Sequence, residues 1–264
     1  MSKETITSRQ NTLYKDIISL EKSKERKAKN QFVIEGFKEI NLALSGGYEI
    51  IKIIHPEDID AAIINQKIFE GIELVSFSRS LFDDICFRKG IPNLIAIAKT
   101  KIHNILEFDV SAYSIIIVLE SIEKPGNIGA ILRTADASGA DMVILCDIAT
   151  DLYNPNIIRN SIGCVFTKKI ALMSSQDAKD FLIREKFNIF TTYLHTENEY
   201  FVEDFKKKTA IVFGTEATGV SSIWLTNEIK KIKIPMLGVI DSMNVSNSVA
   251  VIQYEILRQR TNVK

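Results

Sequence analysis

The sequence predicts an α/β protein with mostly parallel strands. Short apolar runs alternate with helical stretches along all 264 residues. The run from Tyr113 to Leu119 is almost wholly apolar and rich in β-branched residues, which is typical of a strand buried on both faces of a sheet. Several strand-like runs lead into polar segments that precede helices, and α/β folds place their ligand sites there.

Residues 1–104 are expected to form one small α/β domain. Its predicted strands are Ile50–Ile54, Glu73–Phe77 and Asn93–Lys99. Its predicted helices are Ile6–Lys22, Phe37–Leu44 and Ser78–Cys86. A polar and less regular stretch, 100–112, separates this domain from a second one, expected over residues 105–264.

The second domain continues the alternation of strands and helices after the Tyr113–Leu119 strand. Its further predicted strands are Met142–Cys146, Val165–Ile170, Asn188–Tyr193, Ala210–Phe213 and Ile229–Ile234. The last helix is predicted over Val245–Arg260 because apolar residues recur there at helical spacing, so one face is expected to pack on the sheet.

Composition excludes several classes of protein. The chain has 33 Lys and Arg against 33 Asp and Glu, so any binding of nucleic acid must come from local patches. Its three cysteines have no CxxC spacing, and its three histidines lack a metal-like partner spacing, so reduced thiols and no metal are expected. Neither a signal-peptide core nor a membrane-length apolar run is found, which predicts a cytoplasmic protein.

The segment Pro125–Gly139 is the first of three motif-like segments. Pro125 turns the chain after a strand, and Asn127 is placed to cap the helix that follows. Arg133 lies about one and a half turns inside this small, apolar helix, where it could hold an anion in a cleft. An ordinary surface arginine remains the alternative reading of this motif alone.

The other two segments, Gly214–Ser221 and Ile234–Ser246, also follow strand-like runs. The first lacks the Lys-Ser/Thr of a P-loop and the glycine spacing of a dinucleotide-binding fingerprint, which argues against a Rossmann oxidoreductase. Its glycines suit a loop that brings backbone groups close to a ligand, with Glu216 as a positioning or capping residue. Hydroxyl and amide side chains precede the last helix, where capping chemistry is the simpler alternative.

Together and in this order, the three segments resemble the motifs of the SpoU class of SPOUT RNA methyltransferases, also called the TrmH family. Ser8–Asn11, Arg26–Asn30 and Phe32–Gly36 resemble, more loosely, the small ribosomal-protein-like substrate-binding domain of many members that act on ribosomal RNA. The resemblance covers almost the whole chain. It implies a C-terminal domain whose chain end is threaded into a trefoil knot.

The resemblance also implies an enzyme that uses S-adenosylmethionine to methylate a ribose 2′-hydroxyl, with ribosomal RNA as the expected substrate. Transfer RNA, or a non-catalytic SPOUT-fold protein that binds RNA in ribosome assembly, is the alternative. By motif position, the cofactor-binding residues are Leu194, Gly214, Ile234, Met243 and Ser246. The residues implied in catalysis are Asn127, Arg133, Glu216, Asn244 and Ser246.

Members of the family are homodimers, so the resemblance implies that the C-terminal domains pair and that the second subunit supplies Arg133 to each site. A guanidinium is a poor base, so we expect Arg133 to bind a phosphate and stabilise the forming alkoxide. Lys and Arg outnumber Asp and Glu in the N-terminal stretch, which favours contact with phosphates there. The expected RNA-binding residues are Arg9, Lys15, Arg26, Lys27 and Arg159.

Overall fold

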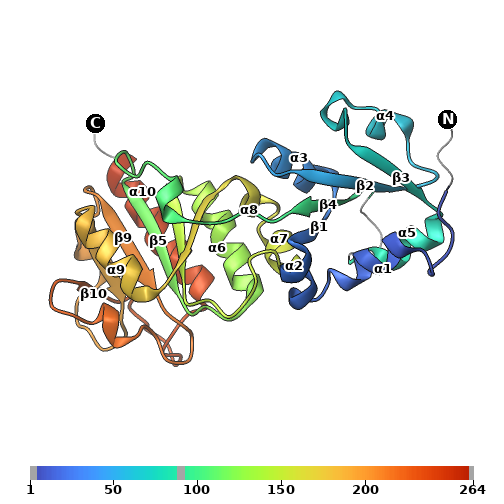
Figure 1. Ribbon diagram of the computed structural model, residues 1–264. Coiled ribbons are helices and arrows are strands. Elements are labelled where there is room, and N and C mark those ends of the chain that lie inside the picture. The colour runs from blue at the N-terminus through green and yellow to red at the C-terminus, as the bar shows by residue number, and fades with distance from the viewer. Residues whose placement is uncertain (1–4, 88–92, 262–264) are drawn as a thin grey trace. The chain divides into compact units, whose positions relative to one another are not determined.

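The computed structural model describes residues 5–87 and 93–261 (Figure 1). By their contacts, the residues form two units. Of the described residues, the first contains those up to Ile102 together with Asp151–Thr167, and the second contains His103–Thr150 and those from Lys168 onward. The first unit thus includes a segment of the expected second domain, 151–167, which the sequence analysis did not assign to it.

The first unit is built on a four-stranded sheet of order β1-β4-β2-β3. Its strands are β1 (Gln31–Glu35), β2 (Ile50–Pro56), β3 (Glu73–Phe77) and β4 (Ile95–Lys99). Only β2 and β3 pair in parallel, since β4 runs antiparallel to both of its neighbours. This sheet therefore departs from the mostly parallel pattern, and β1 was not among the expected strands.

Helices and short turns of helix surround this sheet. They are α1 (Thr12–Ser19), α2 (Ser23–Lys29), α3 (Phe37–Ser45), α4 (Ala61–Ile64), η1 (Lys67–Phe69), α5 (Arg79–Ile85), α7 (Pro155–Asn160) and α8 (Cys164–Thr167). Helix α1 starts later than expected because the Asn11 side chain accepts a hydrogen bond from the Leu13 amide and caps it. Ile6 instead pairs with Phe77 as an isolated β-bridge.

Aromatic packing ties segment 151–167 into the core of the first unit. The ring of Phe32 stacks on Tyr153 with centroids 4.2 Å apart and on Phe166 at 5.8 Å. Tyr48 meets both of those rings edge-on. The expected strand over Val165–Ile170 is wrong in its first half, because the apolar side chains of 164–167 belong to a buried helical turn. A short apolar run cannot distinguish these two cases.

The second unit contains a wholly parallel six-stranded sheet of order β10-β8-β9-β5-β6-β7. The strands are β5 (Ile115–Glu120), β6 (Met142–Cys146), β7 (Lys169–Met173), β8 (Asn188–Thr192), β9 (Thr209–Phe213) and β10 (Lys230–Ile232). Every residue of β5 is buried, which confirms the expectation of a central strand. The chain places β6 and β7 on one side of β5 and β9 on the other, so the strand order reverses beside β5.

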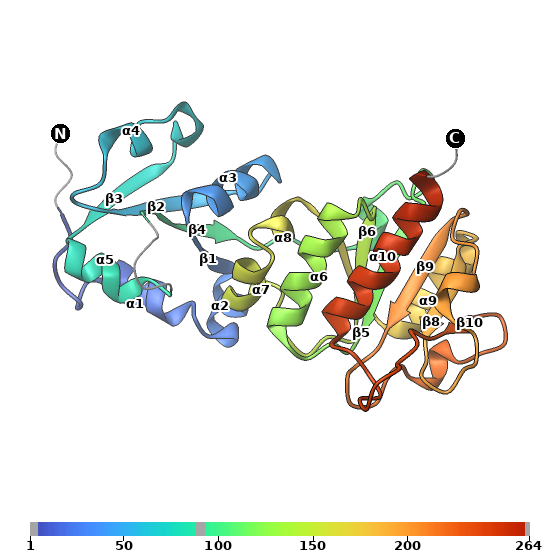
Figure 2. The ribbon, with the colours of Figure 1, turned by 180° about the vertical axis from the view of Figure 1, so that it is seen from behind.

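Helices cover both faces of this sheet. They are α6 (Pro125–Ala137), α9 (Ser175–Arg184) and α10 (Val245–Thr261), with short 3-10 turns η2 (Ile105–Glu107), η3 (Tyr200–Val202) and η4 (Ser222–Trp224). Helices α6 and α10 lie side by side on one face, as Figure 2 shows, and α9 packs on the other. The α/β class with a helix-flanked parallel sheet is therefore confirmed for this unit.

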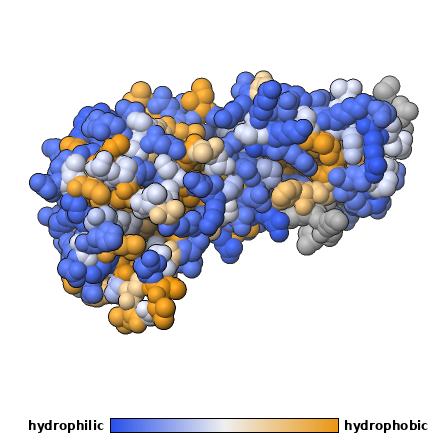
Figure 3. Space-filling model, turned by 90° about the horizontal axis from the view of Figure 1, so that it is seen from below, coloured by the Kyte–Doolittle hydropathy of each residue, from blue (hydrophilic) through white to orange (hydrophobic). Residues whose placement is uncertain are grey.

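The surface is mostly hydrophilic on the face drawn in Figure 3, where apolar side chains form separate patches. The larger apolar residues of the sheets are buried in the two cores. Among the residues that the structure describes, no helix is both long enough and apolar enough to span a membrane.

Candidate active site

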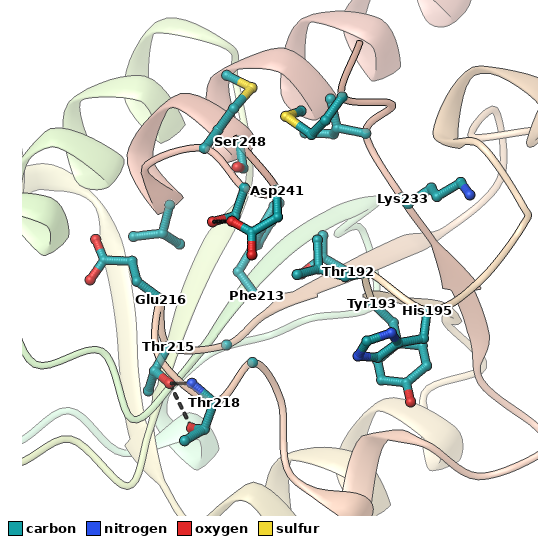
Figure 4. Close-up of a pocket in the computed structure, with 18 of the residues that line it drawn as sticks. Thr192, Tyr193, His195, Phe213, Thr215, Glu216, Thr218, Lys233, Asp241 and Ser248 are labelled. Carbon is teal, nitrogen blue, oxygen red and sulfur yellow. Dashed lines mark hydrogen bonds between the residues drawn. The ribbon is translucent and has the colours of Figure 1, made fainter. Parts of the chain in front are cut away.

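The three motif segments meet at the carboxyl ends of the parallel strands in the second unit. Segment Gly214–Ser221 follows β9, the segment from Ile234 follows β10, and α6 begins after β5. The segments after β9 and β10, the end of β8 and the start of α10 surround a cavity of about 240 Å³ (Figure 4), and α6 lies outside its lining. The strand-end position is where the sequence analysis expected a ligand site.

One polar cluster joins all three motifs. The Nδ2 atom of Asn127 donates to Oε1 of Glu216 at 2.6 Å. The Nδ2 atom of Asn244 donates to the same oxygen at 3.2 Å and approaches Asn127 Oδ1 at 3.2 Å. Lys124 lies 3.2 Å from the other Glu216 oxygen. The cluster fixes the relative position of α6, the loop after β9 and the start of α10.

The structure gives Asn127 a different local role from the one expected. Helix α6 begins at Pro125, and Lys124 is its N-cap residue without a side-chain cap bond. Asn127 therefore lies in the first turn of the helix rather than at its cap. Its side-chain amide does not cap the helix and instead bonds to Glu216.

The loop after β9 is closed on itself. Thr215 and Gly219 exchange two backbone hydrogen bonds of 3.0 Å, and the Thr215 and Thr218 hydroxyls lie 2.8 Å apart. A Cβ atom at Gly214 would lie 2.2 Å from the Gly219 carbonyl and 2.4 Å from the Val220 nitrogen. Only glycine fits this close approach of two backbone segments.

Four of the five residues expected to bind the cofactor line the cavity: Leu194, Gly214, Ile234 and Met243. Ser246 does not line it. Its amide and its hydroxyl instead donate to Asn244 Oδ1 at 2.9 Å and 2.6 Å, so Ser246 orients the Asn244 side chain.

Several residues that line the cavity were missed by the sequence analysis. They are Thr192, Tyr193, His195, Thr215, Thr218, Lys233, Met236, Asp241 and Ser248, most of which Figure 4 labels. Most of them share one signal, which is their position at or just after the end of β8, β9 or β10, whereas Asp241 and Ser248 lie near or within the start of α10. Lys233 is paired with Glu197 at 3.1 Å and Glu216 with Lys124 at 3.2 Å, whereas Asp241 forms no ion pair with the described residues and adds negative charge to the cavity wall.

Arg133 lies two turns into α6 and is exposed. It does not line the cavity of its own chain. It forms no hydrogen bond or ion pair with the residues in 5–87 and 93–261. The structure thus brings Asn127, Glu216 and Asn244 together and leaves the Arg133 guanidinium open to a further molecule.

Cys146 ends β6 near this region. Burial, with the Asp147 and Glu120 carboxylates, raises the pKa of the Cys146 thiol well above its usual range, so it stays protonated and is no nucleophile. No three His, Cys, Asp or Glu side chains within the described ranges gather as a metal site would require.

The basic residues expected to bind RNA occupy different environments in the first unit. Lys27 and Arg159 are exposed, and Lys15 is exposed with its Nζ 2.8 Å from Gln10 Oε1. Arg9 is exposed but paired with Asp84.

Arg26 requires a correction, because its side chain is only 3% exposed. It donates to Asp151 Oδ2 at 2.5 Å and to the carbonyls of Leu20 and Glu21 at 2.8 Å. It is therefore a structural residue of the core of the first unit. The basic pattern of the sequence could not separate it from its exposed neighbours.

Comparison with known families gives two matches that together cover most of the chain. The family described as SpoU rRNA Methylase matches residues 114–254, more than half of the chain. The family described as MRM3-like substrate binding domain matches residues 11–96.

Individual proteins resemble the chain over nearly its full length. A 23S rRNA (uridine(2479)-2′-O)-methyltransferase of Streptomyces viridochromogenes is 25% identical over 245 residues, 89% of this chain and 85% of that protein. A crystal structure of an RNA 2′-O ribose methyltransferase is 34% identical, with a TM-score of 0.85, and covers 98% of this chain and 100% of that one. An AdoMet-bound rRNA methyltransferase of Sinorhizobium meliloti is 25% identical, with a TM-score of 0.86 and 97% of each chain covered.

Proposed function

This chain belongs to the SpoU rRNA methylase family, and we propose that it transfers a methyl group from S-adenosylmethionine to a ribose 2′-hydroxyl of 23S ribosomal RNA. The observation that carries the proposal is the meeting of Asn127, Glu216 and Asn244 beside a cavity in a chain of this family. The named 23S rRNA relative from Streptomyces viridochromogenes supports the substrate. Ribosomal RNA as substrate also makes the cytoplasm the proposed site of action.

The chemistry of the cavity fits S-adenosylmethionine. Apolar side chains of Leu194, Ile234, Met236 and Met243 line it and suit an adenine ring, while backbone groups around Gly214 and the threonine hydroxyls can bond to polar atoms. The Asp241 carboxylate favours a positively charged ligand. When bound, S-adenosylmethionine supplies an electrophilic methyl group on a positively charged sulfur.

The polar cluster is proposed to align the site. A displacement at carbon depends on the alignment of the reacting atoms, so a fixed geometry is the main contribution that the protein can make. Asn127, in the first turn of α6, and Asn244, just before α10, hold Glu216, and Ser246 holds Asn244. Their role is to keep the loop after β9 and the start of α10 in fixed positions while RNA binds.

Arg133 is proposed to act in the active site of a second copy of the chain. Its exposure, its lack of a bonding partner among the described residues and its absence from its own cavity support this assignment. A guanidinium stays protonated and carries a fork of donors, so Arg133 would bind the phosphate next to the target ribose and stabilise the forming alkoxide. The active protein is then a homodimer formed through its second unit.

The first unit is proposed to bind the RNA. Its match to a substrate-binding domain supports this, as do the exposed basic side chains of Arg9, Lys15, Lys27 and Arg159. Each would neutralise a phosphate, so binding should weaken as salt is raised.

The test is to incubate the protein with radiolabelled S-adenosylmethionine and unmodified 23S rRNA, with 16S rRNA and transfer RNA as competitors. Label in 23S rRNA at a linkage that resists alkali, and its loss in Arg133→Ala, is the expected result. Label in transfer RNA alone would overturn the assignment of the substrate, and cofactor binding without label in any RNA would favour a non-catalytic role.

A mixing experiment tests the shared active site. Arg133→Ala and Asn244→Ala are each expected to be inactive as homodimers. If Arg133 serves the partner's site, a mixed dimer contains one site with all its residues intact, so mixing the two variants restores part of the activity. No recovery in verified mixed dimers would place Arg133 in the site of its own chain.

A further inference from the structure

Glu120 is a buried carboxylate at the end of the central strand β5, and it is 5% exposed. Its Oε1 accepts hydrogen bonds from Ser175 Oγ at 2.8 Å, Ser221 Oγ at 2.7 Å and Trp224 Nε1 at 3.0 Å. Its Oε2 accepts one from the backbone amide of Ser221 at 2.7 Å. A carboxylate is costly to bury unless donors surround it, so this set of donors stabilises Glu120 where it lies.

Among the described residues, the donors from Ser221 and Trp224 bond to Glu120 and to no other acceptor. The Ser175 hydroxyl, in contrast, also lies 2.6 Å from Asp147 Oδ2 and has a single proton to donate. It can therefore satisfy only one of the two carboxylates at a time. The partners that do not divide their donors between two carboxylates are Ser221, at the end of the loop after β9, and Trp224, in η4 just beyond it.

That loop forms one wall of the cavity, from Gly214 to Gly219, whereas Glu120 itself does not line the cavity. The loop leaves the end of β9 at Gly214 and reaches Glu120 at Ser221. Between these two points it is braced by the backbone bonds of Thr215 and Gly219 and by the contact of Glu216 with Asn127. Glu120 thus anchors one end of the wall to β5, a central strand whose residues are all buried.

We infer that Glu120 is a positioning residue that holds the loop Gly214–Ser221 in the shape that binds S-adenosylmethionine. The inference rests on the proposed function, because it takes the cavity as the cofactor site. Glu120 acts through the amide and hydroxyl of Ser221 and through the indole of Trp224. It contacts neither substrate.

Two variants separate this role from a purely structural one. Glu120→Gln keeps the side-chain size but replaces one acceptor oxygen with an NH₂ group, which cannot accept from the Ser221 amide in one orientation or from Trp224 Nε1 in the other. Ser221→Ala is milder and removes one hydroxyl bond. Thr209→Val is the matched control, because it removes a buried hydroxyl bonded to the Lys207 carbonyl at 2.8 Å at the opposite end of β9.

The measurements are the Kd for S-adenosylmethionine by equilibrium dialysis, the Tm, and the fluorescence of Trp224, the single tryptophan of the chain. We expect Glu120→Gln to raise this Kd roughly tenfold and Ser221→Ala about threefold, with shifted Trp224 emission in both variants. Thr209→Val should lower the Tm and leave the Kd within about twofold of the wild type. In steady-state assays the KM for the cofactor should rise in Glu120→Gln while the KM for RNA stays near the wild-type value.

The inference is overturned if Glu120→Gln and Ser221→Ala lower the Tm but bind the cofactor with the Kd of the wild type, since Glu120 would then serve stability alone. A wild-type protein that binds no S-adenosylmethionine is a different result. It rejects the proposed cofactor site and the inference with it.

Discussion

The Asn127 amide donates a hydrogen bond to Glu216 at 2.6 Å, although the two residues are 89 positions apart in the chain. The bond joins the first turn of α6 to the loop that follows β9. Glu216 also accepts a bond from the Asn244 amide, and Lys124 lies nearby. Loss of the bond from Asn127 should therefore disturb the wall of the cavity to which Glu216 belongs.

Asn127→Asp is expected to reduce kcat/KM for methyl transfer by about tenfold or more. The substitution removes the donor and places a second carboxylate against Glu216, and like charges at such a distance repel. Initial rates with radiolabelled cofactor measure the effect. Asn247→Asp adds the same charge to an exposed position of α10 and should change the rate less than about twofold. Equal losses in the two variants would assign the effect to charge alone.

Arg133→Lys is expected to lower kcat by about 10²- to 10³-fold while the Kd for S-adenosylmethionine stays near the wild-type value. Lysine keeps the positive charge but lacks the planar fork that binds a phosphate at two points. Single-turnover rates and cofactor titrations measure the two quantities. A near-normal rate in Arg133→Lys would show that the charge is enough and that the fork has no role.

Gly214→Ala is expected to weaken cofactor binding by about tenfold or more, because the added Cβ would overlap the Gly219 carbonyl at 2.2 Å and the backbone must shift. Gly238→Ala is the matched control, since a Cβ at that position meets no atom within 4 Å. Equilibrium dialysis should give Gly238→Ala a Kd within about twofold of the wild type. If both alanine variants bind equally well, the loop tolerates the shift and its shape is not critical.

Arg26→Met is expected to cost about 3 to 5 kcal/mol of folding stability, because it leaves the buried Asp151 without its ion pair. Lys27→Ala is expected to leave the Tm unchanged. It should reduce by about one the steepness of the plot of log K for RNA binding against the logarithm of the salt concentration. Thermal melts and filter binding at several salt concentrations separate the two effects. An unchanged Tm in Arg26→Met, with weaker RNA binding, would return Arg26 to the RNA-binding surface.

The fold of the second unit could be predicted because its strands carry a strong local signal. The β-branched run ending in Leu119 and the polar segments after each strand identified the sheet and the edge where the site lies. The same edge brings Asn127, Glu216 and Asn244 together, as motif position suggested. Their catalytic roles, the homodimer and the trefoil knot stay predictions.

The rest depended on contacts between distant residues that local patterns do not contain. Arg26 looks like its exposed neighbours in sequence, yet it meets Asp151, 125 positions away. Asp241 and Thr192 line the cavity only because three strand ends converge there. In the same way, Val165 and Phe166 resemble a strand, and their helical turn is set by packing on Phe32 and Tyr48.

The membership of segment 151–167 in the first unit affects how the chain folds as it is made. Synthesis proceeds from the N-terminus, so β1 to β4 leave the ribosome well before Tyr153 and Phe166, which complete their aromatic core. Strands β5 and β6 of the second unit are translated in between. The first unit therefore lacks Tyr153 and Phe166 until after β5 and β6 have been made. During that interval the apolar surface of Phe32 that these rings cover is exposed. The first unit can complete its core only after part of the second unit has been made, and a chain that ends before Phe166 lacks part of that core.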